Sequence, residues 1–466
     1  MNAQSPDFSS YISPFSLRYG SKEMRNVFSE ENKYKLWRRI WIALAEEQYK
    51  AGLITKPELE DLKNNENNIS IERIQEIEKE TKHDVVAAIR EFSEKAHVGG
   101  GKIHLGATSM DIVDNADMIK MKEALFIIEN KILKLLSLFS NLIDKYAALS
   151  CMGYTHLQPA EPTTVGYRLA YYAQDLMSVL AQLRFVKNEI KGKGIKGAVG
   201  TSASYQALLE GKNTPVEIFE KGVMKNLGLE AVLISTQVYP RQFDYLVLSV
   251  LATLASSLSK FAGDLRILQS PTIGEWSEPF SNKQVGSSAM PFKKNPISSE
   301  NICSLGRYVT KLPEIALENA TLSYLERTLD DSANKRLIIP EGFLAIDQIV
   351  ITAEKILSGL VINEKRIIIN LQLYAPFAAT ESILIELVKK GADRQEAHEI
   401  LRSISMKAWS AIQEGKANPM ENLLKKNKDL SIYITKKQIE KLLYVSHHIG
   451  DAPERALRLV NKIKSL

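Results

Sequence analysis

Three long apolar stripes with helical spacing constrain the fold of this 466-residue chain more than any other feature of its sequence. The first stripe repeats an apolar residue at steps of three and four: Leu125, Ile128, Ile132, Leu135, Phe139, Leu142 and Tyr146. The second repeats in a similar way: Leu169, Tyr172, Ala173, Leu176, Leu180 and Leu183. The third covers most of Asp244 to Gln269. This spacing puts apolar side chains on one face of a helix, and a helix of about 20 residues is about 30 Å long. The sequence therefore predicts a bundle of long helices.

The rest of the chain supports an all-α fold. No clear alternation of strands with helices appears, which disfavours a Rossmann or barrel fold. At about 150 residues per domain, a chain of this length is expected to have about three domains. We predict an N-terminal helical domain at residues 1–109, in which one helix ends at Gly52, where glycine is a natural C-cap. The long-helix bundle is predicted at 110–362, and a C-terminal domain of shorter helices at 363–466.

Charge and composition exclude several classes of protein. With 60 basic and 55 acidic residues the net charge is only +5, which argues against a nucleic-acid partner. The first 16 residues lack a basic segment and an apolar run, so no signal peptide is expected. The most apolar stretch, Tyr245 to Ala262, contains several serines and a lysine and is too polar to span a membrane. Cys151 and Cys303 have no metal-ligand spacing, so no metal site is expected. Two cysteines in a long chain indicate a reduced, cytoplasmic protein, although counting leaves a disulfide between them open.

The segment GSSAMPFKKNP, Gly286 to Pro296, concentrates residues that restrict the backbone and could carry chemistry. Its two prolines exclude a regular helix, and its glycine permits tight or positive-φ backbone. On composition alone, a plain surface loop explains it about as well. A serine such as Ser287 or Ser288 acts as a base only where its alkoxide is stabilised, which backbone N–H groups of the turn could do. Lys293 and Asn295 add a cation and a hydrogen-bond donor for developing negative charge.

Two other segments carry histidines. GYTHLQPAEPTT, Gly153 to Thr164, contains His156, and histidine suits proton transfer because it titrates near neutrality. A lone histidine in a polar stretch is nevertheless more often structural. In KHDVVAAI, Lys82, His83 and Asp84 precede a run with helical character, where Asp84 would fit an N-cap.

Two segments invite interpretation as ligand-binding sites. In HLGATSMDIVDNA, Thr108 and Ser109 open a predicted helix, where hydroxyls and amides suit an anion as well as a helix cap. Gly192, Gly194 and Gly197 formally spell GxGxxG. A dinucleotide fingerprint needs a strand before it and a helix starting within it, whereas here a long helix precedes lysine-rich sequence. We interpret this segment as a flexible loop that ends the helix.

Taken together, these motifs resemble the adenylosuccinate lyase branch of the fumarase/aspartase superfamily. The signature GSSxMPxKxNP is complete at its fixed positions, and the THLQP, KHDVV and HLGATS segments resemble the same branch closely. The resemblance runs from Arg18 to the turn at residues 450–453 and is weakest after Pro419. It implies three all-helical domains with Ser287 as the general base, on a mobile loop that closes over substrate. It implies His156 as the general acid.

The resemblance also implies a set of substrate contacts. Those in the motifs above are Lys82, His83, Asp84, Thr108, Ser109, Lys293 and Asn295. Those that match positions elsewhere are Arg18, Tyr19, Gln237, Arg327, Ser332 and Arg336. The arginines and the serine suit a nucleotide phosphate, which favours positive, donor-rich partners. Asn301 is retained as a contact, although some family members have arginine there, and Glu300 is a candidate to polarise His156.

The implied reaction is β-elimination of fumarate from a succinylated amine. In this family the substrates are adenylosuccinate, which gives AMP, and SAICAR, which gives AICAR, both in purine nucleotide biosynthesis. No metal or organic cofactor is implied, because the substrate's own carboxylate is the electron sink. Four subunits form a twenty-helix core in the family, and three of them contribute to each site. A homotetramer is therefore expected, and the long apolar stripes are compatible with it.

Two other functions compete with this one. Argininosuccinate lyase is a related enzyme, but the segments around Arg18-Tyr19 and Arg327–Arg336 resemble a nucleotide-phosphate site instead. A non-catalytic helical scaffold, as in the lens crystallins related to these lyases, is a different class of function. The presence of Ser287, His156 and Lys293 disfavours a scaffold.

Overall fold

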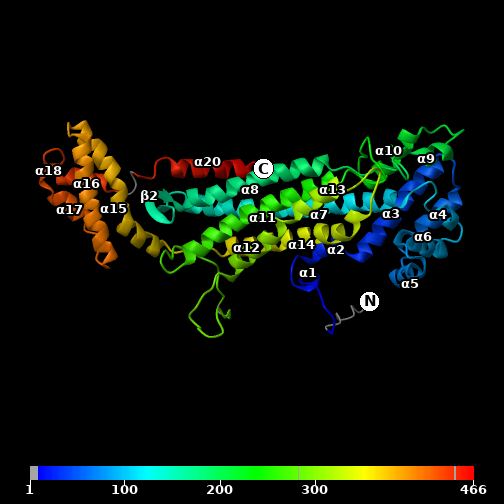
Figure 1. The fold of residues 1–466 in the computed structure, drawn as a ribbon, viewed down its shortest axis with the longest axis horizontal. Coiled ribbons are helices and arrows are strands. Elements are labelled where there is room, and N and C mark those ends of the chain that lie inside the picture. The colour runs from blue at the N-terminus through cyan, green and yellow to red at the C-terminus, as the bar shows by residue number, and fades with distance from the viewer. Residues whose placement is uncertain (1–8, 282, 445–447) are drawn as a thin grey trace. The chain divides into compact units, whose positions relative to one another are not determined.

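Long α-helices dominate the structure, a computed structural model that describes residues 9–281, 283–444 and 448–466. Figure 1 shows their course along the chain. The helices before the first long one are α1 (Pro14–Leu17), α2 (Lys22–Val27), α3 (Glu30–Lys50), α4 (Lys56–Asn64), α5 (Ile71–Thr81), α6 (Asp84–Lys95) and the short 3-10 helix η1 (Gly100–Lys102). The middle of the chain forms α7 (Ser109–Tyr146), α8 (Val165–Glu189), α9 (Ala203–Leu208), α10 (Val216–Leu227), α11 (Gln242–Gln269), α12 (Ile297–Val309), α13 (Leu312–Thr321) and α14 (Asp330–Ser358). The remainder forms α15 (Glu364–Lys389), α16 (Arg394–Gln413), α17 (Met420–Lys426), α18 (Lys428–Ser431), α19 (Lys436–Leu442) and α20 (Ala452–Lys464). The predicted all-α fold is confirmed.

The three apolar stripes lie on the three helices that the sequence predicts. Most of their residues are fully buried, for example Leu135 on α7, Leu183 on α8 and Leu254 on α11. Aromatic side chains fill part of the same interior, where the ring of Phe139 lies 5.5 Å from that of Phe261. Burial of these faces removes apolar surface from water and is the main favourable contribution to the stability of such helices.

The chain forms two compact units. The first contains residues 1–131, 179–256 and 304–351, and the second contains residues 132–178, 257–303 and 352–466. Five unit boundaries fall inside α7, α8, α11, α12 and α14, so each of these helices contributes residues to both units. The three domain ranges expected from the sequence remain a prediction.

Strands are short among the described residues. β1 (Ser150–Thr155) and β2 (Gln158–Thr164) form an antiparallel hairpin, and β3 (Trp276–Ser277) pairs with β4 (Val361–Ile362). Both pairs belong to the second unit. The hairpin holds the THLQP segment, for which the sequence did not predict a strand.

Helix termination follows local chemistry at the predicted position near Gly52. Helix α3 ends at Lys50, and Gly52 has a φ of +68°. The Gly52 N–H donates to the Tyr49 carbonyl at 3.0 Å, and the Leu53 N–H donates to the Gln48 carbonyl at 2.8 Å. Glycine adopts this left-handed conformation without a Cβ penalty, so the predicted helix end is confirmed.

Two helices, α11 and α15, are long and apolar enough to cross a membrane by length and composition alone, so the expectation that residues 245–262 of α11 are too polar to do so is wrong. Half of the most apolar window of α11 is buried inside the protein, and a third of that of α15. Core helices of soluble proteins pass the same test, so length and composition are weak support for a membrane segment here.

The interpretation of Gly192–Gly197 as a flexible loop is wrong in one respect. Helix α8 does end at Glu189, just before it, and the only strand-like pairing described there is a single bridge between Gly192 and Ala231. The lysines, however, are buried. Lys193 pairs with Asp111, and the Lys196 ammonium lies 2.5 Å from the Glu220 carboxylate. Lysine enrichment is usual for solvated loops, but here each lysine has a carboxylate that offsets its desolvation.

Candidate active site

The signature loop holds Ser287 in a turn in which its side chain accepts hydrogen bonds. The Ser287 Oγ accepts the backbone N–H of Ala289 at 3.3 Å and that of Met290 at 3.1 Å. Ser287 itself is half-buried, whereas Ser288 is exposed. Two N–H dipoles directed at one hydroxyl oxygen favour negative charge on that oxygen. Of the two serines, Ser287 therefore has the environment that a serine base requires.

The base of the loop is closed by contacts that leave no room for a side chain at Gly286. The Asn295 amide donates to the Gly286 carbonyl at 3.0 Å. A Cβ atom on Gly286 would lie 2.0 Å from the Lys293 carbonyl oxygen, closer than real Cβ contacts allow. The Lys293 side chain itself is exposed. In this conformation Asn295 braces the loop through its side-chain amide.

Two side chains fasten the loop to the helices at its ends. The Gln269 amide, at the end of α11, donates to the Lys294 carbonyl at 3.0 Å and accepts the Glu278 N–H at 2.9 Å. The buried Glu278 carboxylate accepts the N–H groups of Ser298 and Ser299 at 3.1 and 2.5 Å, which caps the first turn of α12. These contacts fix Glu278 before the signature loop and Lys294, Ser298 and Ser299 at its C-terminal end.

His156 occupies the tip of the β1–β2 hairpin. His156 and Leu157 have φ values of +52° and +60°, and Thr155 pairs with Gln158 across the turn. Two consecutive positive φ angles are typical of a type I′ hairpin turn, which usually contains Asn or Gly. Non-glycine residues in this conformation are strained and are found more often at functional sites. The His156 side chain is exposed at this tip.

Arg168 on α8 contacts the backbone of the hairpin. Its guanidinium donates to the Met152 carbonyl at 2.6 Å and lies 3.3 Å from the buried Glu275 carboxylate. Glu275 also accepts a hydrogen bond from the Asn370 amide at 2.9 Å.

Among the described residues no hydrogen bond joins His156 to Ser287 or Glu300, and the charged partner of Glu300 is Arg266 at 3.9 Å.

The KHD segment lies between α5 and α6. Lys82 ends α5 with a φ of +54°, and Asp84 is the first residue of α6. The expectation that Asp84 is the N-cap is wrong, because His83 caps the helix by accepting the Val86 N–H at its Nδ1, 3.4 Å away. This leaves one oxygen of Asp84 3.6 Å from the guanidinium of Arg336 on α14.

Thr108 and Ser109 stand at the start of α7, as predicted. The Thr108 N–H donates to the Asp111 carboxylate at 3.0 Å. Asp111 is fully buried, pairs with Lys193 and also accepts the Gly197 N–H at 3.2 Å. The Asp111 carboxylate thus joins the start of α7 to Lys193 and Gly197, which are distant in sequence.

Two of the residues expected at the nucleotide end are in direct contact. The Gln237 side-chain oxygen accepts a hydrogen bond from Arg327 at 3.2 Å, and the Gln237 N–H donates to the Glu326 carbonyl at 3.2 Å. Ser332 and Arg336 stand four residues apart on α14, so they lie on one face of that helix. Asn301, on α12, belongs to the second unit and is half-buried.

Arg18 and Tyr19 follow the short helix α1. Both N–H groups donate to the Pro14 carbonyl, and the Tyr19 ring packs edge-on against Phe15 at 5.8 Å. The Tyr19 carbonyl accepts from Arg25 at 3.0 Å, which holds the turn in place. The Arg18 side chain is left exposed.

His104 is a candidate that the sequence analysis did not single out, although it begins the HLGATS motif. It has a φ of +67°, and its Nδ1 accepts the indole N–H of Trp41 at 3.1 Å. Burial lowers the pKa of His104 to about 4; the Asp111 charge opposes this shift and the nearby His83 adds to it. The sequence signal for an unusual backbone at this position was Gly106, two residues after His104. Gly106 also has a positive φ.

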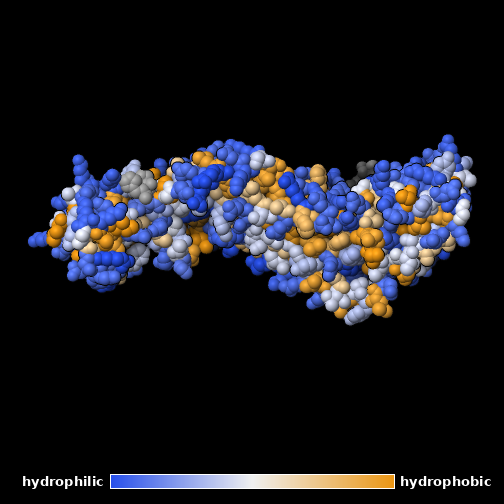
Figure 2. Space-filling view, turned by 90° about the horizontal axis from the view of Figure 1, so that it is seen from above, coloured by the Kyte–Doolittle hydropathy of each residue, from blue (hydrophilic) through white to orange (hydrophobic). Residues whose placement is uncertain are grey.

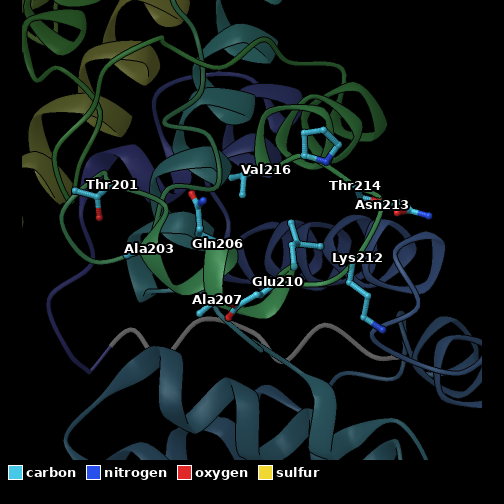
Figure 3. A pocket seen from close by; sticks show the side chains of 11 residues that line it. Thr201, Ala203, Gln206, Ala207, Glu210, Lys212, Asn213, Thr214 and Val216 are labelled. Atoms are coloured by element: carbon cyan, nitrogen blue, oxygen red, sulfur yellow. The ribbon is translucent and has the colours of Figure 1, made fainter.

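A surface depression of about 840 Å³ in the first unit runs from Thr201 to Val216 around α9, and none of the predicted site residues lines it (Figure 3). Among the described residues, no group of three or more His, Cys, Asp or Glu side chains could hold a metal ion, and both cysteines are free.

Comparison with known proteins identifies the family. Residues 18–310 match the family described as lyase, and residues 376–459 match the one described as the adenylosuccinate lyase C-terminus. An adenylosuccinate lyase from Saccharomyces cerevisiae is 35% identical over 463 residues, which cover 98% of this chain and 95% of that protein. One from Methanocaldococcus jannaschii is 38% identical over 458 residues, covering 97% and 96%. The chain belongs to the adenylosuccinate lyase family.

The match to the adenylosuccinate lyase family extends past Pro419, where the resemblance read from the sequence is weakest. Solved structures agree on the fold. A fumarate lyase from Mesorhizobium superposes with a TM-score of 0.84 at 22% identity, covering 97% of this chain and 99% of that one. A 3-carboxy-cis,cis-muconate lactonizing enzyme from Pseudomonas putida gives the same TM-score at 21% identity and the same coverage. At these identities the likeness shows the fold alone.

Proposed function

We propose that this protein is a C–N lyase that eliminates fumarate from adenylosuccinate, giving AMP, and from SAICAR, giving AICAR, in purine nucleotide biosynthesis. Membership in the adenylosuccinate lyase family and relatives of that name at 35–38% identity over nearly the whole chain support the reaction. The geometric observation that carries it is the turn in which two N–H groups point at the Ser287 hydroxyl.

Ser287 is the general base in this proposal. It removes the proton from the carbon beside a carboxylate of the succinyl group, and the electron pair of that C–H bond forms the new double bond as the C–N bond breaks. The N–H groups of Ala289 and Met290 lower the cost of the Ser287 alkoxide. Lys293 and Asn295 belong to the same loop and are proposed to bind the substrate's negative charge once the loop closes.

His156 is the general acid. It gives a proton to the leaving nitrogen, a step that typically contributes about 10²- to 10⁴-fold to the rate. Its exposed position on a strained turn keeps the imidazole at the tip of the hairpin, available to a bound ligand. Lys82, His83, Asp84, Thr108, Ser109 and Asn301 are proposed substrate contacts.

The nucleotide end of the substrate is assigned to the first unit. Arg327, Ser332 and Arg336 supply cationic and hydroxyl donors to the phosphate, beside the positive end of α14. Gln237, which already accepts a bond from Arg327, and the exposed Arg18 with Tyr19 are proposed to complete this end.

We further propose that four copies of the chain assemble, with each site built from more than one copy. Large apolar side chains remain exposed on the long helices of a single chain: Phe126, Tyr167, Tyr171, Phe185 and Ile267. On the face shown in Figure 2, hydrophobic surface is interspersed with hydrophilic surface. Exposed apolar side chains on long helices are typical of subunit contacts.

The two free cysteines are consistent with a reducing, cytoplasmic location.

Turnover by the purified protein tests this function. Adenylosuccinate, SAICAR and argininosuccinate are supplied separately, and fumarate is followed together with the amine product. We expect cleavage of the first two and no cleavage of argininosuccinate. Cleavage of argininosuccinate alone would identify a different lyase, and no turnover of any succinyl compound would favour a non-catalytic scaffold.

A further inference from the structure

The interior of the first unit contains a cluster of charged side chains that the proposed reaction does not use. It is formed by α7, the start of α11 with the segment just before it, and α14. Its members are Asp114, Asp117, Arg241, Asp244, Asp331 and Lys335. Only 5% of Arg241 and 7% of Asp331 is exposed to solvent. Charges this deeply buried persist only when each has a partner.

Arg241 is the link between the three parts of the cluster. Its Nη1 donates to both oxygens of Asp114 at 3.2 Å, and its Nε lies 2.7 Å from the Asp331 carboxylate as an ion pair without an aligned hydrogen bond. Asp114 also accepts the Tyr239 N–H at 2.9 Å. Removal of one partner would leave a buried charge incompletely compensated, so the arrangement resists displacement.

The cluster adjoins, along the chain, the residues assigned to the nucleotide phosphate. Asp331 is next to Ser332 in the chain and four residues after Arg327, and Arg241 is four residues after Gln237. The two segments are therefore joined twice. The half-buried Gln237 accepts a hydrogen bond from Arg327 at 3.2 Å, and the buried Arg241 pairs with Asp331.

We propose that Asp331 is a positioning residue for the phosphate end of the substrate site, and that it acts through Arg241. This inference rests on the proposed function. The ion pair fixes the backbone at the start of α14, and Arg327 and Ser332 thereby point at the phosphate with little freedom. Fixed geometry matters because a misplacement of about 1 Å can cost about 10²-fold in rate. The pair belongs to the first unit, whereas Ser287 and His156 belong to the second, so we expect substrate binding to depend on the pair more than the chemical step does.

Asp331→Asn tests the proposal, because it keeps the side-chain shape and removes the charge that faces Arg241. We expect the KM for the succinylated purine nucleotide to rise about tenfold while kcat changes much less. Glu129→Gln is the matched control. Glu129 is also largely buried in the first unit and pairs with Arg184 at 2.7 Å and with Lys187, far along the chain from the proposed contacts. It should leave KM within about twofold of the wild type.

A double-mutant cycle with Arg327→Gln separates positioning from general destabilisation. If Asp331 acts by aiming Arg327, the effect of Asp331→Asn on KM should shrink to near onefold once Arg327 is gone. An equal effect in both backgrounds, or a loss in kcat alone, would overturn the proposal. Arg241→Lys keeps a cation but cannot contact both the Asp114 and Asp331 carboxylates, so it should also raise KM. If Asp331→Asn fails to fold, this variant tests the proposal in its place. A wild-type protein that does not cleave the nucleotide at all refutes the proposed function instead.

Discussion

At the scale of single residues, the environment of Ser287 separates it from its neighbour. A serine hydroxyl is a weak base, so its use depends on the local donors that stabilise the alkoxide. Ser287 accepts two backbone N–H groups, and Ser288 is exposed. The sequence could name the pair and its superfamily role, but the donors belong to Ala289 and Met290, whose direction only the folded turn defines.

Ser287→Ala should fold and assemble normally and lose at least about 10³-fold in kcat. The oxygen that receives the substrate proton is absent, while the backbone turn needs no side chain to form. Steady-state release of fumarate measures the loss, and circular dichroism with size-exclusion chromatography checks the fold. Near-normal turnover would mean that the base is misassigned, and Ser288→Ala would be the next variant.

His104→Asn should reduce the loss of stability in acid. In the wild type, burial lowers the pKa of His104 to about 4. His104 therefore stays neutral in the folded protein, whereas in the unfolded chain it binds a proton below about pH 6.5. The stability due to the neutral histidine is therefore full above pH 6.5 and is lost as pH falls towards 4. Asparagine cannot titrate and tolerates the positive φ of this position.

The thermal midpoint measured at pH 7, 6 and 5 checks this expectation. The wild type should lose more degrees than His104→Asn over this range. Parallel curves for the two proteins would show that His104 does not titrate as described.

At the scale of elements, hydrophobic periodicity was enough to locate α7, α8 and α11, because a buried helix face imposes the spacing directly. The hairpin of β1 and β2 was not predictable in the same way. Its second strand contains Pro159 and Pro162, which remove backbone donors, and its turn is His156-Leu157 without the Asn or Gly that signals a hairpin. It is held instead by Arg168, which lies just after the hairpin, and by Glu275, which is distant in sequence.

Gly286→Ala should distort the signature loop and lower kcat by about 10²-fold or more without unfolding the protein. The new Cβ would lie 2.0 Å from the Lys293 carbonyl, so the turn that directs N–H groups at Ser287 must shift. Fumarate release measures the effect. Gly101→Ala is the control, because a Cβ there meets nothing within 4 Å. Equal activity of the two variants would contradict the loop geometry described here.

For the molecule as a whole, the sequence predicted the fold class and family but not which charged side chains are buried or which partners they have. Lys193, in a segment predicted to be a flexible loop, is buried against Asp111, and Arg241 is buried between Asp114 and Asp331. Such pairs join residues more than 80 positions apart, so no local pattern reveals them. The chain also forms two compact units, and their boundaries inside long helices carry no sequence signal.

Ser287 and His156 are proposed to act together on a succinylated purine, with the two residues of one site supplied by different copies of the chain. Ser287→Ala and His156→Ala are each expected to be inactive. Co-expressed in equal amounts, they should form mixed assemblies in which about a quarter of the sites have both residues intact. We therefore expect recovery of about a quarter of wild-type adenylosuccinate cleavage. No recovery, in assemblies that mass spectrometry shows to be mixed, would contradict it.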